Sequence, residues 1–300
     1  MKTEKILAQA WKDLVIAVVG GDEREQEIAR LAAATGASVR AFGFPGADAV
    51  AGVAHADTAH AALQDAHVAL FPIPGMTMDG AIFATEKIVP DQALLSVMAK
   101  GAHIVLGKAD NGLRAAAKTL GIGLHEYEHD KELMLLRAPA IVEGALQHMI
   151  ANTAFTIHMA RVCVVGQGNI GTVLTRTLIA LGARVTVAAR NPVQRASAYT
   201  MGADTMELDD LETRANTFDI ICSTVPAPLV TAAVIDRMPE NALVIDLSAP
   251  PGGCDLDHAR KSGRAGIWAR ALGRRAPITV GASQWMGIER IIRDVMQIKD

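Results

Sequence analysis

The stretch that decides the fold is Arg161-Val162-Cys163-Val164-Val165-Gly166-Gln167-Gly168-Asn169-Ile170-Gly171. It begins with a continuous, mostly β-branched apolar run, which is typical of a strand buried on both faces of a parallel sheet. The run ends in the glycine pattern G-x-G-x-x-G. In that pattern Gly166 permits the tight turn, Gly168 lets the backbone approach a pyrophosphate, and Gly171 lets the next helix pack close to the strand.

The residues that follow fit the same unit. The pattern predicts a helix over 172–181, ended by Gly182, and a second strand over 184–189. The helix would start with free N–H groups and the positive end of its dipole near the phosphates. A strand before the glycines and a helix after them is the context that separates this fingerprint from an ordinary glycine-rich turn. We therefore predict a dinucleotide-binding fold, with cofactor contacts from Gly166, Gly168, Asn169, Ile170 and Gly171.

The end of the second strand indicates which dinucleotide binds. NAD sites usually carry Asp or Glu there for the ribose 2′-hydroxyl, whereas this chain has Arg190-Asn191-Pro192. Arg195 follows about one helical turn later. Arginine matches phosphate geometry, so we predict NADP, with Arg190, Asn191 and Arg195 near the 2′-phosphate. The alternative is that both arginines are solvated surface cations.

Strand and helix signals alternate along the rest of the chain, which favours an α/β fold. Before the fingerprint, strands are expected at 14–20, 38–43, 67–72, 102–106 and 122–126, with helices at 23–35, 58–64, 91–100 and 111–120. A long helical stretch, 131–151, contains Pro139, where a kink or restart is expected. After the second strand of the fingerprint unit, further strands are expected near 205–207, 218–223 and 242–246, and an amphipathic helix at 283–298.

These elements predict two doubly wound parallel-sheet, Rossmann-like domains with an interdomain crevice. We expect a substrate domain at 1–130, bridging helices at 131–158 and an NADP-binding domain at 159–282. The last helix, 283–300, is expected to pack back on the first domain. Ligands of open α/β sheets bind at the carboxyl ends of the strands. Ser223-Thr224-Val225-Pro226 and the loop that begins at Ser248 should therefore flank the nicotinamide.

Composition narrows the class of protein. The net charge is −3 with no basic run, which does not favour nucleic acid as a partner, and no apolar stretch reaches the ~18 residues of a membrane span. Met1-Lys2-Thr3-Glu4-Lys5 is typical of an amphipathic helix rather than of a secretory signal, so a cytoplasmic location is expected. A homo-oligomer is also expected. The polar cluster His125, Glu126, Glu128, His129 and Asp130 lacks the spacing of a standard metal site, and no metal is predicted.

The whole chain resembles the family of dipicolinate synthase A subunits. The resemblance covers nearly the full length, and the glycine fingerprint alone is shared with many dehydrogenases. The more specific carriers are Val19-Gly20-Gly21-Asp22-Glu23-Arg24, Ile141-Val142-Glu143-Gly144, Thr156-Ile157-His158, Ala180-Leu181-Gly182-Ala183, Asp246-Leu247-Ser248 and Pro251-Gly252-Gly253-Cys254-Asp255. The resemblance implies an NADP-linked enzyme that makes pyridine-2,6-dicarboxylate from a dihydrodipicolinate-level product of the lysine pathway. It also implies that the partner is a flavoprotein-like B subunit. The chain departs from the family pattern at 137–141, at 270–275 and at Pro250.

The implied reaction needs groups that hold two carboxylates and a base that removes a proton. Backbone N–H groups of 75–80 with the Thr77 hydroxyl, near Gly80, are candidates for one carboxylate. Arg137, Arg270 and Ser248 are further substrate candidates, and Lys108 is a weaker one. Glu143 is the preferred acid/base, although a carboxylate favoured by a helix dipole is the alternative reading. His158 is a second catalytic candidate, although a histidine that packs in a linker is more common.

Two other functions stay open from the residues. The first is a non-catalytic NADP-binding subunit or sensor. The second is another dehydrogenase, of the 2-hydroxyacid type. That class usually carries a downstream His-Glu or His-Gln pair, and 270–284 contains no histidine.

Overall fold

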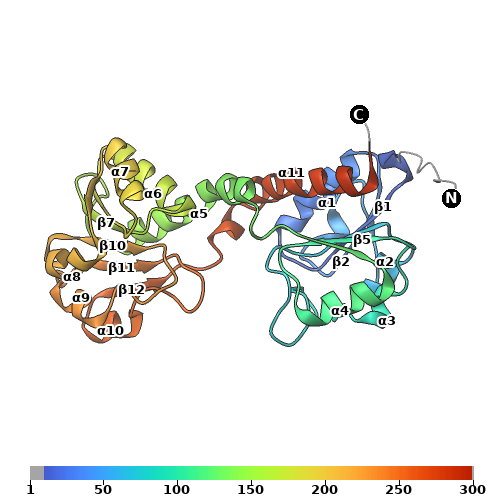
Figure 1. Ribbon diagram of the computed structural model, residues 1–300, viewed down its shortest axis with the longest axis horizontal. Helices are drawn as coiled ribbons and strands as arrows, with labels where there is room; N and C mark the ends of the chain where they lie inside the picture. The colour runs from blue at the N-terminus through green and yellow to red at the C-terminus, as the bar shows by residue number, and fades with distance from the viewer. Residues whose placement is uncertain (1–9, 299–300) are drawn as a thin grey trace. The chain divides into compact units, whose positions relative to one another are not determined.

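The structure is a computed structural model that describes residues 10–298, so the helix predicted at the N-terminus lies outside the described residues. The chain divides into two compact units, 1–136 with 276–300, and 137–275. Each unit is built around one parallel sheet of six strands, with helices on both faces (Figure 1). The predicted α/β class with two doubly wound domains is confirmed.

The first unit has the strand order β3-β2-β1-β4-β5-β6. Its strands are β1 Val15–Val19, β2 Ser38–Phe42, β3 Ala54–His55, β4 Val68–Leu70, β5 His103–Leu106 and β6 Gly123–Glu126. Its helices are α1 Arg24–Ala34, α2 Ala59–Leu63, α3 Gln92–Leu95, α4 Asn111–Leu120 and α11 Pro277–Met296. Helices α1 and α11 cover one face of this sheet, and α2, α3 and α4 cover the other (Figure 1).

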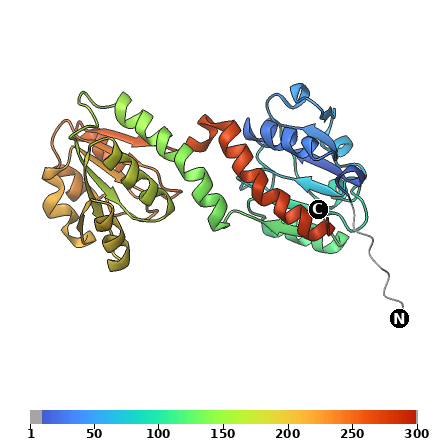
Figure 2. The ribbon, with the colours of Figure 1, turned by 90° about the horizontal axis from the view of Figure 1, so that it is seen from above.

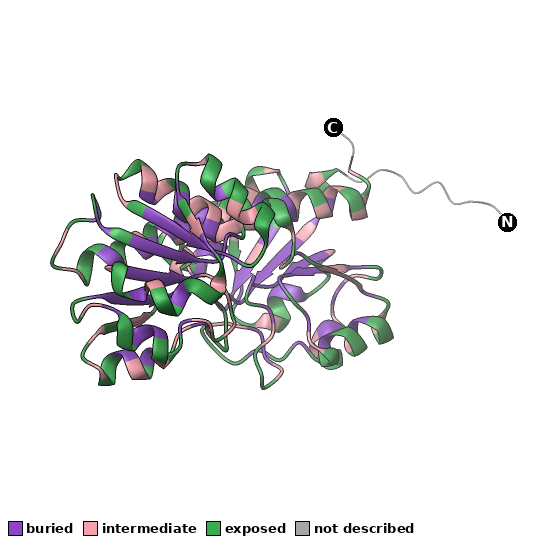
Figure 3. Cartoon of the chain, turned by 60° about the vertical axis from the view of Figure 1, so that its left-hand side comes forward, coloured by how far each residue is buried: buried purple, intermediate pink, exposed green. Residues whose placement is uncertain are grey.

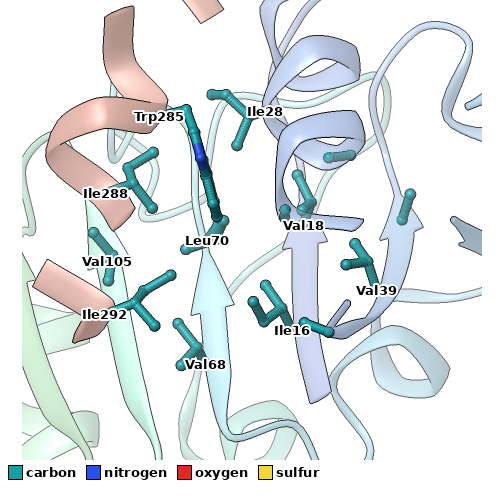
Figure 4. Packing of buried hydrophobic residues seen from close by; sticks show 14 of the residues in the cluster. Ile16, Val18, Ile28, Val39, Val68, Leu70, Val105, Trp285, Ile288 and Ile292 are labelled. Carbon is teal, nitrogen blue, oxygen red and sulfur yellow. The ribbon is translucent and has the colours of Figure 1, made fainter. Parts of the chain in front are cut away.

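The core of the first unit explains why α11 belongs to it. Trp285, Ile288 and Ile292 of α11 are buried, and they point toward Leu70, Val105 and their neighbours on the sheet (Figure 4). A Cβ on Gly281 would lie 2.6 Å from the carbonyl oxygen of Arg24, so the two helices pack closely at this glycine. Figure 2 shows α11 lying along this unit. The apolar face expected of the last helix therefore packs on the first sheet.

The second unit repeats the same topology, with the order β12-β11-β10-β7-β8-β9. Its strands are β7 Arg161–Val165, β8 Arg184–Ala188, β9 Asp204–Met206, β10 Ile220–Ser223, β11 Leu243–Asp246 and β12 Ala265–Trp268. Its helices are α6 Asn169–Ala180, α7 Pro192–Thr200, α8 Leu211–Arg214, α9 Ala232–Arg237 and α10 Leu256–Lys261. The central strands β7, β10 and β11 are buried and rich in valine and isoleucine, as both-faced burial requires (Figure 3).

Several elements differ from the sequence-based expectation. Strands β3 and β12 were not predicted, because β3 has only two exposed residues and β12 is a half-buried edge strand without a long apolar run. Helix α3 is shorter than expected, and α11 starts at Pro277, where proline suits the first helical turn. Helix α5, Lys131–Ala151, contains Pro139 and is assigned as one helix, and the division between the units falls within it.

Candidate functional site

The glycine-rich turn joins β7 to α6. Gly166 has a φ of +93°, and a Cβ there would lie 2.4 Å from Val225 Cγ2. A Cβ on Gly171 would lie 2.2 Å from the Gly166 carbonyl oxygen, so strand and helix can approach this closely only with glycine present. At Gly168, by contrast, a Cβ would find no atom within 4 Å. This open space lies at the N-terminus of α6, where a pyrophosphate fits.

A cavity of about 420 Å³ extends from this turn over the carboxyl end of β8. It is lined by Gly166, Ala188, Ala189, Arg190, Asn191, Gln194, Leu208, Val225, Ala227 and Leu229. Small and branched apolar side chains make up most of the wall, which suits a purine ring, and the polar side chains gather beside α7. Sequence reasoning missed Gln194, Leu208 and Leu229, because no local pattern marks residues that only the fold brings to this wall.

Arg190 and Asn191 stand at the polar side of the cavity. Asn191 Oδ1 accepts the Val193 N–H at 2.8 Å and so caps α7. The Arg190 side chain is exposed and makes no hydrogen bond or ion pair within residues 10–298. A cation at the end of β8 is therefore available to an anionic ligand.

Arg195, which was predicted to lie near the 2′-phosphate, is bonded to groups of the chain itself. Its guanidinium donates to the carbonyl oxygens of Ala189 and Arg190 at 2.8 and 2.9 Å, and to Glu207 Oε1 at 2.8 Å. It does not line the cavity. Through these three hydrogen bonds Arg195 supports the loop that carries Arg190.

The loop after β10 closes the turn from the other side. The Thr224 hydroxyl donates to the Val165 carbonyl oxygen at 3.1 Å, and Ser223 is fully buried with its hydroxyl 3.4 Å from the Val225 carbonyl. Val225 lines the cavity, and Pro226 is exposed. The structure therefore brings the predicted residues of β10 and of the glycine turn together, and holds them mainly through backbone contacts.

The loop after β11 is held by a buried carboxylate. Asp246 Oδ1 accepts the N–H and the hydroxyl of Ser248 at 2.9 and 2.6 Å, and Oδ2 accepts the N–H groups of Gly253 and Cys254 at 2.6 and 3.2 Å. The hydroxyl of Ser248, predicted to bind substrate, is thus directed inward at Asp246. We therefore assign Ser248 to the support of its own loop.

Arg270 lies beyond the carboxyl end of β12 and is exposed. Its guanidinium carbon is 5.1 Å from the centre of the Trp268 ring, and Trp268 Nε1 donates to the Ser248 carbonyl oxygen at 3.0 Å. The stacked tryptophan orients the arginine while its charged end stays accessible. Arg270 therefore remains a candidate for a carboxylate ligand.

Glu143 projects from α5 toward the segment after β12. Its side chain is 63% exposed and forms an ion pair with Arg275, while the neighbouring Gly144 packs against Leu272. The segment 270–275, in which the sequence departs from the family pattern, therefore contacts α5 just after the other departing segment, 137–141. Arg137 is half-buried in α5 and has an interaction partner.

His158 lies at the amino ends of the strands of the second sheet, opposite the glycine turn. It precedes β7, and its ring packs against Gly182, which follows α6. The glycine turn and the loops after β10 and β11 are at the carboxyl ends of the same strands. His158 is thus at the amino end of β7, and the glycine turn is at its carboxyl end. We therefore leave His158 out of the site.

The loop 72–80 of the first unit uses its polar groups internally. The N–H groups of Gly75, Met76, Thr77 and Gly80 donate to the carbonyl oxygens of Pro72, Lys108, Ala81 and Thr77. The Thr77 oxygen lies 2.5 Å from Asp79 Oδ1, and Lys87 Nζ lies 2.8 Å from Asp79 Oδ2. The Lys87 and Thr77 hydrogen bonds hold the pKa of Asp79 well below its usual range. The anion-binding role predicted for Thr77 and Gly80 is therefore not supported by this geometry.

Lys108 lines a cavity of about 460 Å³ at the ends of β5 and β6, with Gly107, Arg114, Glu126, Glu128, His129 and Asp130. Arg114 pairs with Glu126 at 2.5 Å, and Lys108 Nζ lies 4.0 Å from Glu128. In the polar cluster noted in the sequence, Glu126 and Glu128 thus lie beside cations, and His125 contacts the His103 ring at 3.1 Å. Residues 10–298 hold no group of three or more His, Cys, Asp or Glu side chains placed to bind a metal ion.

The turn between β1 and α1 of the first unit already contains a buried carboxyl group, that of Glu25. Glu25 Oε2 accepts the N–H of Asp22 at 2.8 Å, and a Cβ on Gly21 would lie 2.2 Å from the Glu25 carboxyl carbon. Asp22 and Arg24 form a buried ion pair beside it at 2.7 Å. This turn corresponds to the glycine turn of the second unit, and its own carboxylate fills the place of a phosphate. Only the second unit therefore offers a dinucleotide site among the described residues.

Burial makes Glu25 a source of pH-dependent stability. Desolvation raises its pKa from 4.5 to about 7, and Arg24 opposes the shift only in part. A raised pKa in the folded state means that the stabilisation is fully present below pH 4.5 and is lost as the pH rises through 7. Between pH 5 and 8, we expect the free energy of unfolding of the wild type to fall by on the order of 3 kcal/mol relative to that of Glu25→Gln.

Urea unfolding at several pH values tests this expectation. A Trp268→Phe background leaves Trp11 and Trp285, which are 6.2 Å apart in the first unit, as the fluorescent reporters. Stability curves of wild type and Glu25→Gln that stay parallel from pH 5 to 8 would contradict the assignment.

Comparison with known families agrees with the division of the chain into two units. The sequence model of the N-terminal domain of the dipicolinate synthase A subunit matches residues 15–128, and that of the alanine dehydrogenase/PNT C-terminal domain matches residues 138–262. The dipicolinate synthase A subunit of Bacillus subtilis (strain 168) is 30% identical over 276 residues, which are 89% of this chain and 92% of that protein. The second unit thus has a dehydrogenase-type dinucleotide-binding fold.

Solved structures show the same likeness. The crystal structure of the dipicolinate synthase A subunit from Bacillus halodurans has a TM-score of 0.85 at 27% identity, covering 95% of this chain and 99% of that one. The transhydrogenase of Sinorhizobium meliloti has a TM-score of 0.68 at 17% identity, covering 92% and 94%, and shares the fold. No helix within residues 10–298 is both long and apolar enough to cross a membrane.

Proposed function

The chain belongs to the family of dipicolinate synthase A subunits, and we propose that it catalyses the NADP-dependent oxidation of a dihydrodipicolinate-level cyclic dicarboxylate to dipicolinate. The observation that carries the cofactor assignment is the Arg190 guanidinium, which lies at the edge of the cavity beside the glycine turn and has no hydrogen-bond or ion-pair partner within residues 10–298. A small-molecule dicarboxylate substrate, no nucleic acid and a B-subunit partner follow from the same proposal.

Three features of the second unit support NADP over NAD. The end of β8 carries no carboxylate for a ribose 2′-hydroxyl. Glu207, the acid next to this loop, is paired with Arg195. Arg190 is left as an exposed planar cation, and planar guanidinium groups match the oxygens of a phosphate. The space over Gly168 and the apolar cavity wall fit the pyrophosphate and the adenine of the same molecule.

Residues of the chain itself would bind a substrate carboxylate and accept the proton that leaves the ring. NADP, when bound, supplies the two-electron oxidant that accepts hydride. Arg270, oriented by Trp268, would bind one carboxylate of the substrate. Glu143, with its carboxylate held by Arg275, would accept the proton that leaves the ring.

Glu143→Gln keeps the shape of the side chain and removes the base. We expect turnover to fall by about a hundredfold or more, with NADP affinity unchanged, because general-base catalysis contributes to the transition state alone. Arg275→Gln is the matched control, since it breaks the same ion pair but keeps the carboxylate. Equal turnover losses in the two variants would show that Glu143 acts only through the ion pair.

The function is tested with a dihydrodipicolinate mixture generated from lysine-pathway enzymes. The chain is incubated with this mixture and NADP, in the presence and in the absence of the B-type partner, and the pyridine dicarboxylate is followed by chromatography and mass spectrometry. Product that depends on the chain and on NADP supports the proposal. NADP binding without product in either arm would favour the alternative of a non-catalytic NADP-binding subunit.

A further inference from the structure

One buried carboxylate connects the loops on the side of the second sheet away from Arg190. Asp246 ends β11, is 1% exposed, and accepts four hydrogen bonds, two on each oxygen. Burying a carboxylate costs free energy unless its oxygens accept hydrogen bonds. Here the donors of one short loop bond to both oxygens. The loop 247–254 is therefore closed around Asp246.

The closed loop in turn packs against the loop after β10. A Cβ on Gly253 would lie 2.3 Å from the Val225 carbonyl oxygen and 2.6 Å from Ser223 Oγ. The N–H groups of Leu229 and Val230 donate to the Gly253 carbonyl oxygen at 3.1 and 3.0 Å. Moving Gly253 would therefore move the loop after β10, and Thr224 of that loop contacts Gly166 of the glycine turn.

The strand order places these loops on the nicotinamide side. Strand β7 bears the glycine turn, β8 with Arg190 lies on one side of it, and β10 and β11 lie on the other. A dinucleotide whose pyrophosphate lies over the glycine turn and whose 2′-phosphate lies at Arg190 must extend its nicotinamide over β10 and β11.

We propose that Asp246 is a positioning residue, which holds the loops after β10 and β11 in the arrangement that receives the nicotinamide half of the cofactor. This inference rests on the proposed NADP site. Asp246 would not touch the cofactor itself, because all four of its hydrogen bonds go to its own loop. The Ser248 carbonyl oxygen also accepts Trp268 Nε1, so the same carboxylate supports the tryptophan on which Arg270 stacks.

The test separates the two halves of the cofactor. The affinity of the full chain is measured by calorimetry for NADP and for 2′-phospho-ADP-ribose, which lacks nicotinamide. In Asp246→Asn an amide nitrogen replaces one acceptor and faces N–H donors. We expect NADP to bind about tenfold more weakly, the loss of roughly one hydrogen bond to a charged group. Affinity for the fragment should fall less, because Val225 and Leu229 of the loop after β10 also line the cavity proposed for the adenine.

Asp219→Asn is the matched control. Asp219 is a carboxylate of the same sheet that also accepts a backbone N–H, from Arg161 at 2.8 Å, but it lies before β10 at the opposite edge. Its substitution should lower thermal stability and leave both affinities unchanged. If Asp246→Asn does not fold, Ser248→Ala, which removes one of the four hydrogen bonds, should weaken NADP binding about threefold and fragment binding less.

Equal losses for NADP and the fragment, or no loss for either, would overturn the positioning role of Asp246. In the Ser248→Ala arm, NADP affinity equal to wild type would do the same. A wild-type protein that binds neither ligand would overturn the proposed NADP function, and the inference with it.

Discussion

Replacing Gly168 with alanine is expected to weaken NADP binding by about a hundredfold or more, or about 2.7 kcal/mol, with little change in the fold. The φ of Gly168 is −82°, so alanine is not strained there, and its Cβ would meet no protein atom within 4 Å. In the proposed function, the pyrophosphate approaches the backbone through that space. The new methyl group therefore clashes with the ligand alone.

Gly171→Ala provides the contrast within the same turn. Its Cβ would lie 2.2 Å from the Gly166 carbonyl oxygen, so it should separate β7 from α6 and lower the melting temperature. Calorimetric titration and thermal unfolding of both variants distinguish the two effects. A Gly168→Ala protein that binds NADP as tightly as wild type would show that no pyrophosphate lies over this glycine.

Arg190→Asp is expected to reverse the cofactor preference. Aspartate would place a negative charge against the 2′-phosphate and would supply the acceptor that a ribose 2′-hydroxyl needs. We expect NADP affinity to fall by about a hundredfold and NAD affinity to fall little or to rise. Titration of both cofactors, at two salt concentrations, gives the ratio.

Arg184→Asp is the control for this charge reversal. Arg184 is exposed on the same strand, β8, but at its amino end, far along the strand from the cavity. The same change of net charge there should leave the cofactor ratio unchanged. If Arg190→Asp lowers the affinities for NADP and NAD equally, the guanidinium does not read the 2′-phosphate.

Local patterns were sufficient to predict the parts of the fold that depend on neighbouring residues. The apolar run before Gly166, the three glycines and the helix after them form the predicted unit, because strand burial and turn geometry are set by residues close in sequence. Helix α4, which Asp110 caps and Gly121 ends, was also predicted with the bounds it has, because both end signals are local.

Partners that are distant in the chain decided the roles of individual polar residues. Arg190 and Arg195 look alike in the sequence, yet the structure pairs Arg195 with Glu207 and gives Arg190 no ion-pair partner among the described residues, 10–298. Ser248 and Thr77 likewise have their hydroxyls directed into their own loops. No sequence spacing reveals which donors a fold has already used.

The sequence by itself determined two Rossmann-like domains, the glycine turn after β7 and a cation at the end of β8. These features can be read from the short periods of apolar residues in strands and helices and from the turn residues between them. Only the tertiary structure decided that Glu25 fills the matching turn of the first unit, that Asp246 closes the loop after β11, and that His158 lies at the opposite edge of the sheet. Each of these depends on strand order and on close packing between segments, which side-chain periodicity does not encode.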